Sequence, residues 1–262
     1  MEEKKSFVEN SKVAFKGTIN GIVGSIVYEL ILSVLVSVFV TMFVAANNSG
    51  ATAEELSKIS NDIFDKYPIG LVISCLVSLF TLGVFVYLIK WDKFKELIKN
   101  SFNNKTLKYG LVGVLCIMAF SIFYNSTITE LFNLGDSGNS NQENVVALIK
   151  GNMIFGFLTV VILAPVVEEL TYRYCLFGGV YKKKRWLAYL VAGFVFMFMH
   201  SLSSFFTYGF TKELLTEFLY LPPYLFSGLV LCYIYDKSDS LGASTLAHLL
   251  NNLVSFLAIV SL

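Results

Sequence analysis

The stretch APVVEELTYRYC, residues 164–175, places three ionisable side chains in a segment that otherwise has the composition of a membrane span. Glu168 and Glu169 are adjacent, Arg173 follows them, and residues 152–167 carry no charge. A charged side chain in the hydrocarbon region of a bilayer is unfavourable and usually has a function. The stretch therefore predicts a membrane helix that also carries a buried polar site.

The rest of the chain supports this class. It has 262 residues, 55% of them hydrophobic, and a mean hydropathy of +0.66. The apolar residues come in long runs, which predict an all-α, polytopic transmembrane bundle of about seven helices. The whole chain, 1–262, is interpreted as one membrane-embedded domain. The predicted spans are 22–46, 69–89, 109–124, 152–181, 186–208, 214–235 and 241–262.

The fourth span is too long for a straight crossing and contains Pro165, so we expect a tilt or kink there. An eighth helix arises if this span is two pieces. In the sixth span, LPPY at 221–224 predicts a kink or an unwound turn.

Basic residues indicate the orientation, because cytoplasmic loops are enriched in lysine and arginine. With the N-terminus in the cytoplasm, most of the 20 basic residues fall on the inner side. We therefore predict a multi-pass protein of the plasma membrane, with the lipid bilayer as a partner and no nucleic-acid partner. Residues 91–108 predict a short helix on the inner surface, and 133–144 a flexible outer loop.

Further ionisable residues within the predicted spans are Glu29, His200 and His248, and these two histidines are the only ones in the chain. At about 1.5 Å per helical residue, Glu168 and His200 both lie roughly 20 Å from the inner surface. His248 and Asn252 lie roughly 10 and 16 Å deep. Polar groups from three helices thus reach comparable depths, whereas Glu29 is interpreted as structural.

Helical spacing indicates how these groups face. Glu169 and Arg173 are four residues apart and can pair, while Glu168 is rotated by about 100° and is left to face a cavity. A free carboxylate there suits a general base. His248 and Asn252 are also four residues apart, so both can donate hydrogen bonds to one oxygen. The alternative interpretation is a buried polar network that only fixes helix packing.

Three sequence motifs on these spans match a known pattern. EELTYR at 168–173 fits EExxxR, FMFMH at 196–200 fits FxxxH, and HLLNN at 248–252 fits HxxxN. Their order and spacing resemble the CPBP family, which includes type II CAAX prenyl endopeptidases and bacterial bacteriocin-processing or immunity proteins. The resemblance covers a predicted catalytic core of about residues 150–255.

The resemblance implies an intramembrane endopeptidase of the glutamate type, acting on a membrane-associated peptide or protein by CAAX-like C-terminal or leader processing. Glu168 with His200 would activate the attacking water. His248 and Asn252 would stabilise the tetrahedral oxyanion.

The resemblance also implies supporting roles for Glu169 and Arg173, with Phe196 packed beside the site. No cofactor is expected. A zinc site is the alternative, because His200, His248 and Glu168 could supply three ligands, although the HExxH spacing is absent.

Four alternative functions differ from this one in what they require of the sequence. A family member that confers bacteriocin immunity or regulates a partner would need no proteolysis, and a small transporter would use the buried carboxylate as a proton relay. Rhomboid-like serine catalysis is disfavoured because GAST around Ser244 is not its motif. Aspartyl catalysis is disfavoured because Asp136 and Asp236 are predicted to lie in loops.

Overall fold

The computed structural model describes residues 69–132, 139–181, 184–208 and 212–261, with short pieces between 42 and 59. Glu29 and nearly all of the first predicted span, 22–46, lie outside the described residues. Every regular element in the described part is a helix, so the predicted all-α class is confirmed.

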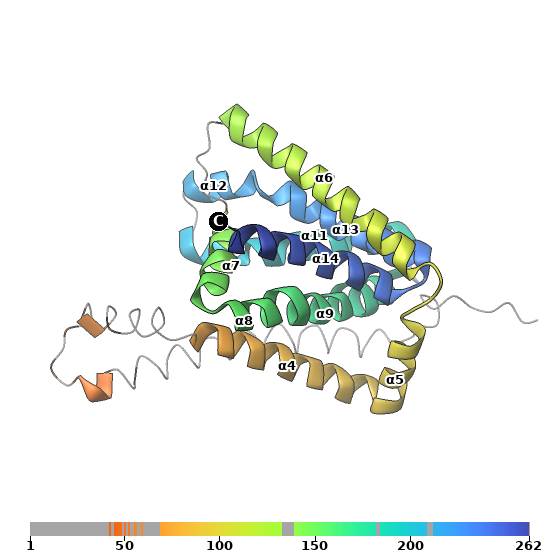
Figure 1. Ribbon diagram of the computed structural model, residues 1–262, viewed down its shortest axis with the longest axis horizontal. Coiled ribbons are helices and arrows are strands. Elements are labelled where there is room, and N and C mark those ends of the chain that lie inside the picture. Colours follow the sequence, from red (N-terminus) through yellow and green to blue (C-terminus); the bar gives the residue numbers. More distant parts are fainter. Residues whose placement is uncertain are drawn as a thin grey trace, which may run out of the picture.

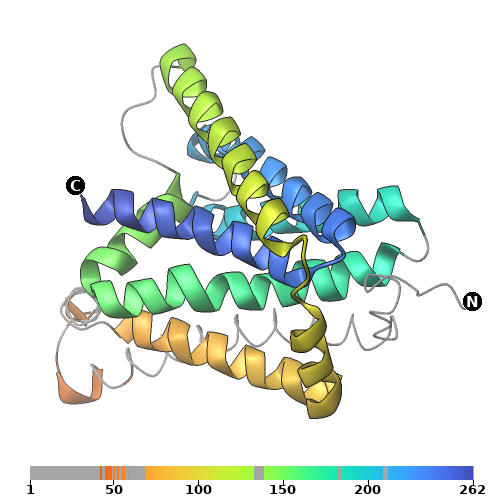
Figure 2. The same cartoon turned by 45° about the vertical axis from the view of Figure 1, so that its right-hand side comes forward.

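Long helices packed side by side form the bundle (Figure 1). The segment that contains both glutamates runs from α8 (Met153–Gly156) to α10 (Gly178–Tyr181) through its middle. One neighbour lies on each side of this segment in Figures 1 and 2, namely α4 (Ile69–Ile89) and α14 (Leu241–Val260). The other long helices are α6 (Thr106–Phe132), α11 (Arg185–Tyr208) and α13 (Leu221–Ser238).

Length and apolar composition make this a multi-pass membrane protein. Among the described residues, four segments are long and apolar enough to cross a membrane: Thr106–Phe132, Met153–Tyr181, Leu214–Ser238 and Leu241–Val260. A fifth is added if the bent pair Cys75–Ile89 and Trp91–Asn100 counts as one span. Each predicted span from residue 69 onward overlaps a described helical segment, although the helix within 186–208 is not among those long and apolar enough by this criterion.

The central segment is one continuous span rather than two pieces, so the eighth helix considered from the sequence does not arise in this segment. The irregularity expected at Pro165 takes the form of two wide, π-helical stretches on either side of α9 (Ala164–Glu168). They are η1 (Phe157–Leu163) and η2 (Glu169–Phe177). Such π-helical stretches are frequent at functional sites, and here Glu168 and Glu169 stand at the junction of α9 and η2.

Two predictions between the third and fourth spans need correction. The third span is longer than 109–124, because α6 continues to Phe132. Ser126 and Thr127 donate their hydroxyls to the carbonyls of Ile122 and Phe123, so these polar side chains have partners within the helix itself. The predicted flexible loop 133–144 is wrong over 140–144, where α7 (Ser140–Gly151) begins. Asn139 caps this helix by accepting a hydrogen bond from the Gln142 amide.

Two other predictions about local structure are confirmed. A turn at 219–220 separates α12 (Lys212–Phe218) from α13, and the prolines of LPPY occupy the first turn of α13, where a missing N–H does no harm. The short helix expected within 91–108 is α5 (Trp91–Asn100), which bends away from α4 by 104°.

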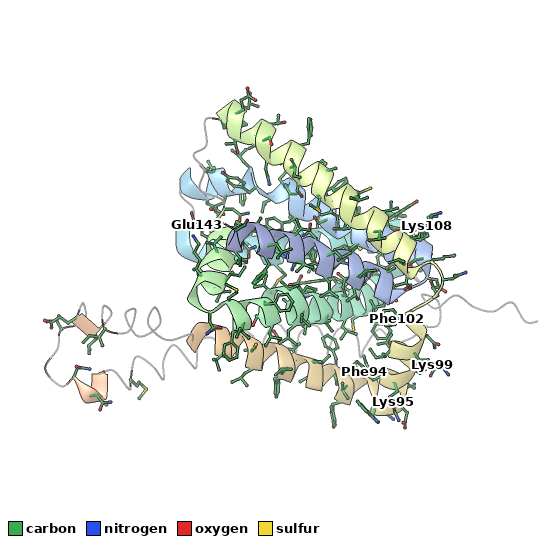
Figure 3. The ribbon with its side chains drawn as sticks, in the orientation of Figure 1. Phe94, Lys95, Lys99, Phe102, Lys108 and Glu143 are labelled. Carbon is green, nitrogen blue, oxygen red and sulfur yellow. The ribbon has the colours of Figure 1, made fainter. Side chains whose placement is uncertain are left out.

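Charge is distributed unevenly between the two ends of the bundle. Figure 3 shows Lys95, Lys99 and Lys108 at one end and Glu143 at the other. This end-to-end asymmetry is the pattern on which the orientation prediction depends.

A close helix crossing brings α11 and α13 together. A Cβ added to Gly228 would lie 3.2 Å from the Cα atom of Gly193, so a larger residue there would push the two helices apart by a few tenths of an ångström. Small residues at a crossing let membrane helices pack backbone to backbone. The contact sets Phe196 and His200, one and two turns further along α11, against α13.

Candidate active site

Three helical segments bring together the ionisable residues identified in the sequence. Glu168 ends α9, His200 lies on α11 and His248 on α14. The Glu168 Oε2 atom lies 4.0 Å from His200 Nε2 and 3.8 Å from His248 Nε2. These separations are too long for direct hydrogen bonds. They are close to the distance between two groups that share one water molecule, which is roughly 4 Å.

A buried ionic cluster stands behind His248. Glu169 Oε1 lies 3.0 Å from Arg173 Nη1 and 2.9 Å from His248 Nδ1, and the side chains of Glu169 and Arg173 are fully buried. The pairing of Glu169 with Arg173 that the spacing predicts is therefore present. Because a carboxylate accepts, His248 donates through Nδ1. Its Nε2 atom, which faces Glu168, carries the lone pair whenever the ring is neutral.

His200 has the same tautomer for a different reason. Its Nδ1 atom lies 2.8 Å from the Phe196 carbonyl oxygen, which can only accept. The His200 Nε2 atom therefore also carries a lone pair toward Glu168 when neutral. Two acceptor nitrogens and one carboxylate thus converge on the same small space, which is suited to holding and deprotonating a water molecule.

The Phe196 ring connects the ionic cluster with both histidines. The Arg173 guanidinium lies over this ring, 4.7 Å from its centroid, which is a cation–π contact in a dry environment. The ring centroid is also 4.4 Å from that of His200 and 5.8 Å from that of His248. Phe196 therefore packs beside the site, as expected.

Asn252 lies on the same face of α14 as His248, but its amide already has a partner. Its Nδ2 atom donates to the Val160 carbonyl in η1 at 2.9 Å, and its Oδ1 accepts from Asn251. An amide nitrogen has two hydrogens, so this bond uses one of them. His248, whose Nδ1 already donates to Glu169, can donate through Nε2 only as an imidazolium. The predicted joint donation to one oxygen therefore requires a protonated His248.

The serine and aspartate of the two rejected chemistries are not presented to a substrate: Ser244 lies inside the buried cluster beside Glu169, and Asp236 lies away from the site. Ser244 is fully buried and donates to the Leu241 carbonyl, so its hydroxyl is not presented to a substrate. Asp236 is not in a loop as predicted; it lies in the last turns of α13. Its carboxylate there accepts from Tyr181, Arg185 and Tyr189. Asp136 lies outside the described residues.

Tyr224 is a site residue that sequence reasoning missed. Its ring stacks on His200, with centroids 4.7 Å apart and planes 27° apart. Asn139 and Asn141 donate to its hydroxyl at 3.2 and 3.1 Å, which ties α13 to the start of α7. The only sequence signal was LPPY itself, which places an aromatic residue in the first turn of a helix.

Replacing Tyr224 with leucine is expected to lower kcat of a reaction that uses His200 about tenfold with little change in KM, because His200 loses the ring that holds its plane. Tyr224→Phe keeps the stacking and should stay within about twofold of the unchanged protein. Since the chain has only two histidines, ¹⁵N spectra of labelled imidazoles can follow the His200 tautomer directly. Equal activity of the leucine and phenylalanine variants would contradict this role.

Comparison with known proteins finds its family match in the part of the chain that forms the site. Residues 150–254 match the family model described as type II CAAX prenyl endopeptidase Rce1-like. A Mycoplasma capricolum protein without a functional name is 29% identical over 66% of this chain and 50% of its own length. No solved structure matches the chain.

Two further relatives match more than half of this chain. The UPF0177 protein YxdF of Lactococcus lactis is 26% identical over 63% of this chain and 84% of its own length. The membrane-embedded CAAX protease MroQ of Staphylococcus aureus is 22% identical over 56% of this chain and 55% of its own length.

The matched region contains both glutamates, both histidines, Arg173 and Asn252. Residues 150–254 of this membrane protein therefore resemble the Rce1-like family of type II CAAX prenyl endopeptidases, in the same part of the chain that carries the CPBP motifs.

Proposed function

We propose that the chain is an intramembrane endopeptidase of the glutamate type, which hydrolyses a peptide bond in a membrane-associated peptide or protein. The observation that carries this proposal is the convergence of Glu168 Oε2 with the Nε2 atoms of His200 and His248, 4.0 and 3.8 Å away. The Rce1-like family match of residues 150–254 supports it independently.

In the proposed reaction, Glu168 and His200 hold a water molecule, and Glu168 takes one of its protons as the oxygen attacks the peptide carbonyl carbon. A bond forms between the water oxygen and that carbon, and the carbonyl oxygen becomes an oxyanion. Protonated His248 and the amide of Asn252 stabilise this oxyanion. Collapse of the intermediate breaks the carbon–nitrogen bond, and Glu168 returns its proton to the leaving amine.

The buried cluster has a supporting role in this proposal. Glu169 orients His248 through Nδ1 and stabilises its protonated form, while Arg173 neutralises the remaining charge on Glu169. Phe196 covers the guanidinium and both imidazoles, which keeps bulk water away from the cluster.

The proposal also covers the location of the protein and the class of its substrate. We propose a plasma-membrane protein with a cytoplasmic N-terminus, because the basic residues gather at one end of the bundle. Its substrate is a peptide or membrane-anchored protein that is cut near its C-terminus or behind a leader. The relative named a membrane-embedded CAAX protease is consistent with this class of substrate.

The activity is expected to need no metal ion. The HExxH spacing of zinc proteases is absent, but Glu168, His200 and His248 converge on one space, so zinc is the alternative that the test must separate. Purified protein in detergent should cleave a mixed peptide library, as measured by mass spectrometry, and keep its rate after dialysis against a zinc chelator. A loss of activity that added zinc restores would replace the glutamate mechanism with a zinc mechanism.

A further inference from the structure

A cavity of about 430 Å³ leads from the two histidines toward the end of the bundle where α6 and α14 finish. Residues from five helices line it, including Phe196, His200 and His248. Along α6 the lining extends from Ile117 to Thr129. At about 1.5 Å per helical residue this is roughly 18 Å, which about five residues of extended chain would span. We call this cavity the polar groove.

The wall of the polar groove combines neutral polar groups with apolar side chains such as Ile117 and Leu231. On α6, Ser121, Asn125 and Thr129 are spaced by four residues and therefore share one face of the helix. Gln142 of α7 and Asn251 of α14 add two more carboxamides. The lining residues include no aspartate, glutamate, lysine or arginine. A polar stripe on a membrane helix is unfavourable against lipid, so this face is suited to a polar ligand.

We propose that the polar groove binds the substrate as an extended, unmodified polypeptide segment of uncharged residues next to the scissile bond. A carboxamide offers both a donor and an acceptor, as a peptide group does, so Asn125, Gln142 and Asn251 can pair with an extended main chain. The segment enters at the end where α7 begins and reaches His200 and His248, whose Nε2 atoms lie about 4 Å from Glu168 Oε2. This inference rests on the proposed function, whose substrate class it defines.

Two other ligand chemistries fit the groove less well. An isoprenoid or acyl chain would remove these amides and hydroxyls from water without replacing their hydrogen bonds. A charged side chain would find no counter-charge among the lining residues. An apolar cavity of about 630 Å³ does exist between α6, α11 and α13, but it is lined by residues such as Val112 and Val230 and includes none of the residues assigned to the site.

A binding experiment with the full-length Glu168→Gln protein tests the groove without requiring cleavage. The probes are a short peptide of Gly, Ser, Thr and Asn with a photoreactive phenylalanine, the same peptide with central Lys or Asp, and the same peptide with a farnesylated cysteine. We expect the neutral, unmodified peptide to bind at least about tenfold more tightly than the others. Tighter binding of a charged or farnesylated peptide would overturn the inference.

Substitutions in the lining of the polar groove test whether the neutral peptide binds there. Asn125→Leu and Gln142→Leu are each expected to weaken binding of the neutral peptide about fivefold, the effect of one lost hydrogen bond. Ser126→Leu, next to Asn125 but outside the lining, is the matched control and should leave binding unchanged. Thermal unfolding of each variant checks that it is folded. Unchanged binding in both folded groove variants would also overturn the inference.

The outcomes separate this inference from the proposed function. If the neutral peptide binds in the groove but the unsubstituted protein cleaves none of the probes, the proposed protease activity fails and the peptide groove stands. If cleavage depends on Glu168 but the groove variants keep the binding and the peptide preference of the unsubstituted protein, the activity stands and the groove assignment fails.

Discussion

Replacing Glu168 with glutamine is expected to lower the rate of peptide cleavage by about 10³-fold or more while the protein still folds. Glutamine keeps the size of the side chain but cannot take a proton from water. The Glu168 side chain is about one quarter exposed, and Oε2 makes no hydrogen bond to the described part of the protein, so the substitution breaks no packing contact of the fold. Cleavage is measured by mass spectrometry of peptide products.

The matched control is Glu130→Gln, which makes the same chemical change on the exposed end of α6. It should leave the rate unchanged. A Glu168→Gln protein that retained full activity would refute the glutamate mechanism. If the protein confers immunity or regulates a partner without proteolysis, Glu168→Gln would leave the cellular phenotype intact, which distinguishes that alternative from a protease.

Replacing Arg173 with methionine is expected to destabilise the protein by about 3–5 kcal/mol, the usual effect of removing one partner from a buried ion pair. Arg173 and Glu169 are both fully buried, so the remaining carboxylate would have only His248 to balance its charge. The substitution would also remove the cation–π contact between the guanidinium and the Phe196 ring. Equilibrium unfolding in detergent micelles measures the change in free energy.

A double variant tests whether charge is the cause. Glu169→Gln combined with Arg173→Met removes both charges and should recover part of the lost stability, since the introduced carboxamide can still accept a hydrogen bond from His248. As a surface control, Lys95→Met breaks the exposed pair with Asp92 and should cost less than about 1 kcal/mol. Equal destabilisation by Arg173→Met and Lys95→Met would show that the cluster is not the anchor of the site.

The sequence alone was enough to predict which residues share a face of one helix, because helical periodicity determines it. The Glu169–Arg173 pair, the separate direction of Glu168 and the shared face of His248 and Asn252 all follow from spacing. Long apolar runs likewise predicted the membrane helices from residue 69 onward. The ends of α6 and α7 were not predicted, because both lie in polar sequence outside the apolar runs, and the start of α7 depends on the cap that Asn139 provides.

Side-chain contacts between different helices were decided by the tertiary structure. The sequence predicted that Glu168, His200, His248 and Asn252 would lie at comparable depth in a membrane bundle. Only the packed structure decided that Glu169 holds His248 through Nδ1, that Asn252 donates to Val160, and that Tyr224 stacks on His200. The physical reason is that helix rotation and crossing depend on side-chain packing from distant segments, such as the contact of Gly193 with Gly228, which no local periodicity records.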